Sequence, residues 1–544
     1  MSRKLFSILL ASFFLFGVVG CTDVGVEPES TTTAENAFQD GQAAKSFLAK
    51  LYAGLSLTGQ QGPAGDGDLQ QIDEGFSQYV RLWWQMQELP TDETVIAWND
   101  ANIQSLNKQN WSAENSFSSA MYARIFFQVA QVNEFLRQTT EQKLEARNIA
   151  ATVREKVPKW RAEARFLRAL SYWHAVDLFG GVPLVTEEEP IGDGTGESAP
   201  EMSSRQEIFN FVESELQAIT SSDGEEVLPP AATAEYARAD KAAARMVLSK
   251  LYLNAEVYVG ESRYDDAVAV TGEIISAYGA SASALESDYH DLFLADNHTA
   301  KGIIFAVPQD GVRSQSFGNT TYLVNASIGG AMSSSDYGVP SGGWAGLRTT
   351  AAAVDLYESN DTRPMFENVP DGGQFFTDEQ QKQVETLTSF SNGFAVPKYQ
   401  NITSDGEPGQ DELFPDTDYP MFRLADAYLT YAEAKLRGGA GGQFDELELV
   451  NLLRERAGLS EISASTLDLD YILDERSREL FWEGSRRTDL IRYGRFTGGD
   501  KLWAFKGGEP QGSATQEFLG LYPIPAGEIS ANPNLTQGDQ NPGY

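Results

Sequence analysis

The residues best suited to hold a ligand lie between Gln78 and Asn102, where aromatic side chains stand beside amide, acidic and basic ones. Flat apolar rings next to hydrogen-bonding groups suit a ligand that carries both C–H faces and hydroxyls. The candidate binding residues of this segment are Arg81, Trp83, Trp84, Trp98, Asn99, Asp100 and Asn102. Their types indicate binding rather than reaction.

Two adjacent tryptophans in this segment are expected to point in different directions. On a helix Trp83 and Trp84 point about 100° apart, and on a strand they point to opposite faces, so both cannot enter one core. At least one is therefore predicted to be displayed, with core packing as the alternative for each. Trp98 is followed by Asn99 and Asp100, and we expect it in a loop.

A second candidate segment is the long polar stretch from Gln309 to Arg348. It contributes Tyr337, Trp344 and Arg348 to the predicted ligand site. Tyr337 is flanked by serines, an aspartate and a glycine, which favours exposure. Trp344 has glycine neighbours, which often mark close packing, so a structural role is the alternative there.

Signals for other chemistry are weak. His174, His290 and His298 show no spacing typical of a metal site or an activated nucleophile, and no EF-hand spacing or Gly-rich phosphate loop is present. We therefore predict no catalytic residue, no metal and no cofactor. The enzymatic alternative is a glycoside hydrolase that uses Asp92 and Glu93 beside Trp98. The plainer interpretation is that Thr91, Asp92 and Glu93 begin a helix.

The formal net charge of the 544-residue chain is −37. Nucleic acid is excluded as a partner, because neutralising phosphates requires basic surface. The acidity suits a neutral ligand better than an acidic one, and adaptation to a saline habitat is the other reading.

The first residues have the pattern of an export signal. Arg3 and Lys4 precede an apolar run that ends at Phe16, and small residues then lead to Cys21, the only cysteine. The run is too short to span a bilayer, so residues 1–20 are predicted to be a removed signal peptide. A lone cysteine there indicates lipidation at Cys21, and residues 21–37 are predicted to form the anchor and a flexible tether.

The elements that must position the candidate residues are mainly helices. Apolar residues recur at three- and four-residue spacing from Trp160 to Phe179, from Phe422 to Leu436 and from Leu469 to Phe481. Residues 242–275 look like one tetratricopeptide unit, with a generic helical hairpin as the alternative. Further helix pairs are expected near residues 115–138, 160–179, 204–220 and 421–457 as its neighbours.

We predict one body over residues 38–544 with a mostly α fold. Its helical scaffold is expected mainly at 38–57, 113–280 and 421–495. A loop-rich ligand face with a few short strands is expected at 58–112 and 300–420, and a C-terminal tail at 496–544.

Four blocks of the chain, taken together, resemble the SusD/RagB family of surface nutrient-binding lipoproteins. They are WRAEARFLRALSYWHAVDLFGGVPLVTE, FRLADAYLTYAEAKLRGG, ILDERSRELFWEGSRRTDLIRYGRF, and LYPIPAGEISANPNL with a terminal QNPGY. In the third block, spacing predicts pairing of Glu475 with Arg478 and of Arg476 with Glu479, in a structural charge network that continues through Glu483, Arg486, Arg487 and Asp489.

The resemblance implies tetratricopeptide-like helix pairs forming a right-handed superhelical scaffold with a loop-rich ligand face. It further implies a non-catalytic, lipid-anchored outer-membrane protein at the cell surface. Such a protein captures oligosaccharide for a SusC-like TonB-dependent transporter. Peptide capture, as in RagB-like members, is the alternative within the family.

Overall fold

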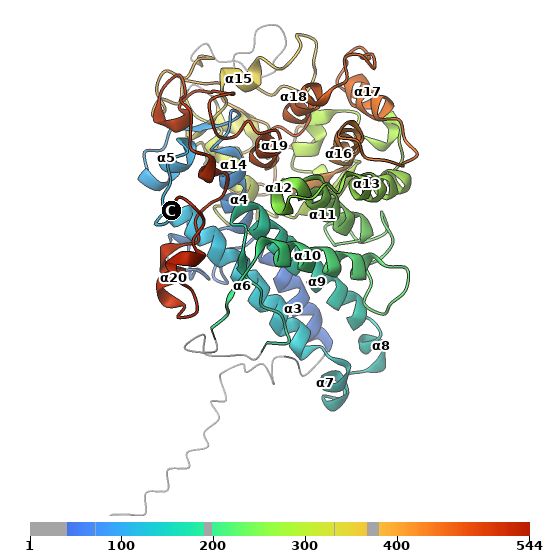
Figure 1. Cartoon of the computed structure of the whole chain (residues 1–544). Coiled ribbons are helices and arrows are strands. Elements are labelled where there is room, and N and C mark those ends of the chain that lie inside the picture. The colour runs from blue at the N-terminus through green and yellow to red at the C-terminus, as the bar shows by residue number, and fades with distance from the viewer. Residues whose placement is uncertain (1–37, 39–40, 71, 190–198, 331, 367–379) are drawn as a thin grey trace, which may run out of the picture.

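A computed structural model describes residues 38, 41–70, 72–189, 199–330, 332–366 and 380–544. The predicted signal peptide, Cys21 and the tether lie outside the described residues. The described chain is mostly helical, with short strands and long loops between the helices (Figure 1). None of its helices combines the length and apolar character needed to cross a membrane.

The α-helices of the described chain vary from one turn to six. They are α3 (Gly41–Ala53), α4 (Tyr79–Glu88), α5 (Ala101–Asn107), α6 (Ser116–Gln138), α7 (Glu141–Ala146), α8 (Ala151–Arg154), α9 (Val157–Leu178), α10 (Arg205–Thr220), α11 (Lys241–Leu253), α12 (Ala255–Val259), α13 (Tyr264–Tyr278), α14 (Asn319–Ala326), α15 (Ala351–Val354), α16 (Leu424–Leu436), α17 (Glu446–Arg456), α18 (Leu469–Glu479), α19 (Arg486–Arg492) and α20 (Ala526–Ala531).

The long helices form a continuous series in which each packs on the next. Helix α6 packs on α9, α9 on α10, α10 on α11, α11 on α13, α13 on α16 and α16 on α17 (Figure 1). The predicted tetratricopeptide-like pair is α11 with α13, and the short α12 lies between them in the chain. The predicted mostly α fold class is confirmed.

Local signals explain where the central helix α9 begins and ends. Pro158 lies in its first turn, where a missing N–H costs nothing. Gly180, at φ +77°, takes the left-handed conformation that closes the helix. Helix α10 begins with a capping box in which Ser204 and Glu207 satisfy each other's backbone N–H groups.

Three small antiparallel sheets tie distant segments together. Strand β1 (Val95–Ile96) pairs with β5 (Leu347–Arg348), β2 (Val182–Pro183) with β3 (Met202–Ser203), and β4 (Ile303–Val307) with β6 (Tyr419–Arg423). The predicted helix from Phe422 therefore begins two residues later, because Phe422 pairs with Phe305 in a strand.

The charge network of α18 and α19 is structural, but one predicted pair is wrong. Glu475 and Arg478 pair at 2.8 Å as expected. Arg476 instead pairs with Asp426 and Asp489, and Glu479 pairs with Arg363, Arg423 and Arg456. Residues 475–479 of α18 are all buried, so charges from other segments reach these side chains and replace the pairing along the helix.

Candidate functional site

The strongest candidate site is an open cavity of about 330 Å³ in the loop-rich part of the molecule. We call it the aromatic pocket. Its lining residues are Asp73, Gly75, Phe76, Arg81, Trp98, Phe317 and Trp344. Three of them, Arg81, Trp98 and Trp344, come from the two segments that the sequence singled out.

The β1–β5 pairing brings the two tryptophans of the pocket together. Trp98 follows β1 and Trp344 precedes β5, so the antiparallel register places them at one end of the same ladder. The Trp98 indole Nε1 donates to the Trp344 carbonyl oxygen at 3.0 Å, and the ring centroids lie 6.5 Å apart. Both side chains are half-buried and keep part of their surface open to the cavity.

Gly346 gives the Trp98 ring its space. A Cβ on Gly346 would lie 2.7 Å from Cε2 of Trp98, closer than side chains tolerate. The indole therefore lies directly against this stretch of backbone. Its orientation is set by the glycine and by the hydrogen bond to Trp344 together.

Arg81 joins two walls of the pocket. Its Nη1 donates to the carbonyl oxygens of Gly75 and Phe317, at 2.7 Å each. The guanidinium lies 4.5 Å from the Phe76 ring centroid and 4.3 Å from that of Tyr322. Burial lowers the pKa of Arg81 to about 10, so the group stays charged at neutral pH and can donate further hydrogen bonds.

The sequence interpretation missed four lining residues: Asp73, Gly75, Phe76 and Phe317. Phe317 lies in a loop and Phe76 ends a short 3-10 helix (Glu74–Phe76), and each stands next to small or polar residues. That context is the signal that would have found them. Phe317 extends the aromatic wall, since its ring centroid lies 6.2 Å from that of Trp344. Asp73 is exposed at the rim and accepts the Gly75 N–H at 3.0 Å.

The expectation that Trp83 or Trp84 is displayed is wrong. Both are buried, because α4 is enclosed on every side. Trp84 packs edge-on against Trp482 and donates to its carbonyl oxygen at 2.9 Å. Trp83 packs on His174 on the other face, so each tryptophan enters a different part of the surrounding core.

Tyr337 and Arg348 also lie inside the protein, contrary to their predicted place at the ligand face. Tyr337 is 4% exposed and belongs to the hydrophobic core, because the turn at Gly338 closes against Asn401. Arg348 is fully buried and donates to the carbonyl oxygens of Leu387, Ser389 and Asn392. Burial lowers its pKa to about 9.

The polar residues after Trp98 lie outside the pocket lining. Asn99 and Asp100 are exposed, and the Asp100 carboxylate caps α5 by accepting the N–H groups of Asn102 and Ile103. The Asn102 carbonyl oxygen accepts from the Asn115 side chain at 2.9 Å. The structure thus assigns Asp100 and Asn102 to the turn that begins α5.

Asp92 and Glu93 neither begin a helix nor face a ligand. They precede β1 and are at most 1% exposed. Burial alone would raise the pKa of Asp92, but Arg486 and Lys501 hold it well below its usual range. Burial raises the pKa of Glu93 to about 7, and its carboxylate accepts from Ser477 at 2.6 Å. A carboxylate pair without access to substrate cannot cleave a glycosidic bond.

His174 is packed, as expected for a helix residue. Its Nδ1 lies 2.9 Å from the Tyr79 hydroxyl, and burial lowers its pKa to about 3, which keeps the ring neutral. In the part of the chain that the structure describes, no cluster of three or more His, Cys, Asp or Glu side chains could hold a metal ion.

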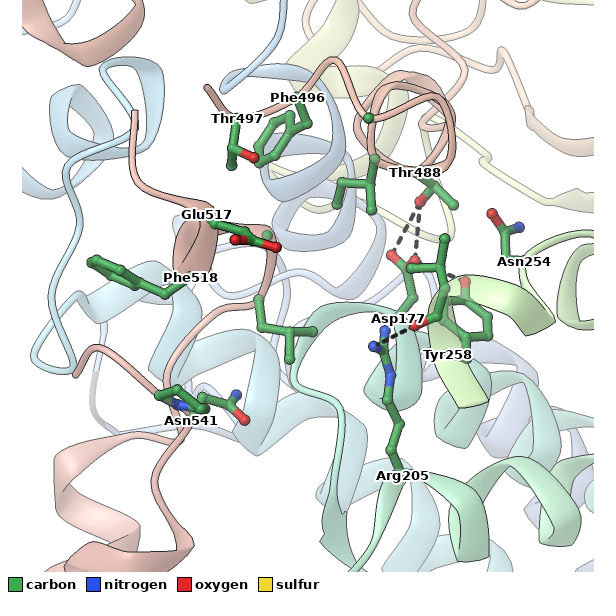
Figure 2. Close-up of a pocket in the computed structure, with 16 residues that line it drawn as sticks. Asp177, Arg205, Asn254, Tyr258, Thr488, Phe496, Thr497, Glu517, Phe518 and Asn541 are labelled. Atoms are coloured by element: carbon green, nitrogen blue, oxygen red, sulfur yellow. Dashed lines mark hydrogen bonds between the residues drawn. The ribbon is translucent and has the colours of Figure 1, made fainter. Parts of the chain in front are cut away.

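A second cavity, of about 390 Å³, lies between the scaffold and the C-terminal tail. Figure 2 shows Arg205, Tyr258, Asp177 and Thr488 gathered at one side of it, and Phe518 and Asn541 at the other. The Asp177 carboxylate already accepts from Gln87, Tyr258, Arg487 and Thr488. These bonds join α4, α9, α12 and α19, so the polar side of this cavity serves the fold.

The series of helices and the loops that it carries match solved structures of the SusD superfamily, which gives the class of fold. Surface glycan-binding protein A from Bacteroides fluxus matches with a TM-score of 0.67 and 23% identity, over 92% of this chain and 99% of that chain. Surface glycan-binding protein A from Bacteroides thetaiotaomicron, solved with laminarihexaose, matches with a TM-score of 0.66 and 20% identity, over 92% of this chain and 99% of that chain.

Sequence comparison relates the chain to a known family. Residues 388–544 match a model described as the SusD family, and residues 78–253 match one described as "Starch-binding associating with outer membrane". Starch-binding protein SusD of Bacteroides thetaiotaomicron is 33% identical, and the match covers 100% of this chain and 99% of that protein. SusD-like protein P2 of Formosa agariphila is 24% identical over 97% of this chain and 98% of its own length. The chain belongs to the SusD family.

Proposed function

We propose that this protein is a non-catalytic, cell-surface lipoprotein of the outer membrane that captures oligosaccharide and delivers it to a SusC-like TonB-dependent transporter. The observation that carries the binding step is the aromatic pocket, with Trp98 and Trp344 at one side and the Arg81 guanidinium beside them. The names of its relatives support the same ligand class, since one is a starch-binding protein and another was solved with laminarihexaose.

The geometry suits sugars for two reasons. The half-buried rings of Trp98, Trp344 and Phe317 offer flat apolar faces to the C–H face of a pyranose. Arg81 donates and Asp73 accepts hydrogen bonds, so both kinds of hydroxyl contact have a partner at the pocket. An overall charge of −37 favours a neutral ligand over an acidic polysaccharide.

The proposed lipid anchor and the proposed transporter partner are supported by observations other than the aromatic pocket. Cys21 at the end of the signal-like segment supports lipidation, and a lipid anchor holds a protein at a membrane without a spanning helix. One matching family model carries outer-membrane association in its description. Membership of the SusD family supports the proposed delivery to a SusC-like transporter.

Binding is tested on the soluble chain without residues 1–37, with a glycan array followed by calorimetry. The parent protein should bind a neutral glycan, and Trp98→Ala should remove that binding while the melting temperature stays within a few degrees. A parent protein that binds no sugar on the array overturns the proposal and points to peptide capture.

The binding-only mechanism has its own test. The parent protein is incubated with the glycans that it binds, and new reducing ends are measured over time. None should form. Turnover that survives in Asp92→Asn and Glu93→Gln would show a hydrolase with its acids elsewhere.

A further inference from the structure

A third cavity, of about 340 Å³, lies between the end of α3, the middle of α6 and the loop around Val312. Its lining includes Leu57, Gln60, Phe127, Gln131, Val312 and Gln315. We call it the Phe127 groove. It shares no lining residue with the aromatic pocket.

The apolar side chains of the Phe127 groove stand outside the hydrophobic core, although the Arg124 guanidinium lies over the Phe127 ring at 5.8 Å. Phe126 packs on Tyr122 at 4.7 Å between ring centroids, whereas Phe127 makes no ring–ring contact within the described chain and stands outside its hydrophobic core. Leu57 is half-buried outside that core as well, and Val312 is 59% exposed. Apolar surface gathered in this way marks a place where something binds.

Two polar side chains of the groove are free to act, whereas Gln315 already donates to the Gly311 carbonyl oxygen and Gln128 to that of Leu51. Gln60 and Gln131 make no side-chain hydrogen bond within the described residues, and each carries two donors and an acceptor. Lys50 and Arg313 add exposed donors at the rim. One aromatic face surrounded by amides is the same combination that makes the aromatic pocket suitable for a sugar.

The groove and the aromatic pocket are walled by the same two loops. The loop after α3 supplies Leu57 and Gln60 to the groove and Phe76 to the pocket, and the loop after β4 supplies Gln315 to the groove and Phe317 to the pocket. Arg124 joins the two ends of the first loop by donating to the carbonyl oxygens of Thr58 at 2.9 Å and Ser77 at 2.5 Å. The Ser316 hydroxyl joins the second loop to the first, at 3.0 Å from the Ser56 carbonyl oxygen.

We propose that the Phe127 groove binds further units of the same glycan chain that occupies the aromatic pocket. This inference rests on the proposed sugar binding and deepens it, because it makes the ligand a long oligosaccharide. The two sites are then linked by the ligand itself, and binding at one raises the local concentration at the other.

The test measures affinity against chain length by calorimetry, with maltooligosaccharides and laminarioligosaccharides from the dimer to the octamer. In the parent protein, affinity should rise with length beyond the units that fill the aromatic pocket. Phe127→Ala should weaken octamer binding about tenfold and leave dimer binding unchanged, as expected for loss of one aromatic anchor. Trp98→Ala should remove both.

Phe211→Ala is the matched control, since Phe211 is also half-buried on a helix with a guanidinium over its ring, that of Arg168 at 5.3 Å. It should leave every affinity unchanged. If Phe127→Ala folds poorly, the double variant Gln60→Ala with Gln131→Ala replaces it and should give the same length-dependent loss. If neither variant weakens octamer binding, the Phe127 groove does not bind the glycan. The proposed sugar site in the aromatic pocket is then unaffected. If neither octamer binds the parent protein and no sugar binds on the array, both the groove and the proposed sugar site are overturned.

Discussion

The indole Nε1 of Trp98 donates a hydrogen bond to the main-chain carbonyl oxygen of Trp344 at 3.0 Å, although 246 positions separate the two residues. The bond holds one aromatic face of the pocket against the backbone that carries the other. Two strands of two residues each are enough to bring the tryptophans together, because β1 and β5 pair in a single antiparallel register.

Gly346→Ala should disable the pocket without unfolding the protein. The new Cβ would lie 2.7 Å from Trp98 Cε2 and must push the ring aside, which breaks the bond to Trp344. We expect at least a ~10-fold loss of glycan affinity by calorimetry. Gly527→Ala is the control, since nothing lies within 4 Å of its Cβ position. Parent-like affinity in Gly346→Ala would show that the ring orientation does not matter.

Arg81→Lys should weaken both stability and binding. A lysine ammonium cannot reproduce the planar guanidinium between Phe76 and Tyr322 while it reaches both the Gly75 and Phe317 carbonyl oxygens. We expect a loss of ~1.5–3 kcal/mol in the free energy of unfolding by urea titration. Arg313→Lys, whose side chain is 81% exposed, should change it by less than ~0.5 kcal/mol. Equal losses of unfolding free energy in Arg81→Lys and Arg313→Lys would contradict the structural role that we assign to Arg81.

Trp84→Ala should act on the fold rather than on the ligand. The side chain is fully buried against Trp482, so its removal leaves a cavity and should cost ~3–5 kcal/mol of unfolding free energy. The folded variant should keep glycan affinity, measured well below its melting temperature. Trp98→Ala is the counterpart and should show the reverse pattern. If Trp84→Ala loses more free energy of glycan binding than free energy of unfolding, Trp84 belongs to the ligand site after all.

Asp418→Asn should change how stability depends on pH. Burial raises the pKa of Asp418 to about 6, above the ~3.9 of an unfolded aspartate. The native state therefore keeps a proton that the unfolded state has lost, and the stability contributed by this carboxyl is full below pH ~4 and lost as pH rises through about 6. Asparagine keeps the acceptor for the Gln309 N–H and cannot ionise.

The measurement is urea unfolding of the parent and of Asp418→Asn at several pH values. Relative to the parent, the variant should gain up to ~3 kcal/mol between pH ~4 and ~7. Asp405→Asn, at an exposed carboxylate, is the control. A constant difference between Asp418→Asn and the parent across this range would mean that the Asp418 carboxyl is not held protonated.

Much of the scaffold was predictable because its signals are local. The repeat of Phe166, Ala169, Leu170 and Trp173 lies on one face of α9, and the glycines after it end the helix. The same local logic failed for Trp83 and Trp84, since it assumes that a helix has a solvent side. Helix α4 has none, and the second half of α18 is buried as well, so Arg476 and Glu479 find partners on other segments.

By itself the sequence determined the helical class, the order of the scaffold helices and two of the aromatic residues of the site, Trp98 and Trp344, whereas the signal segment before Cys21 stays a prediction. Only the tertiary structure decided which of the candidate aromatics meet: it buried Trp83, Trp84 and Tyr337 and set Trp98 beside Trp344. The physical reason is the distance along the chain over which each effect acts. Helical periodicity repeats within a few residues, whereas burial and strand register depend on segments hundreds of residues away.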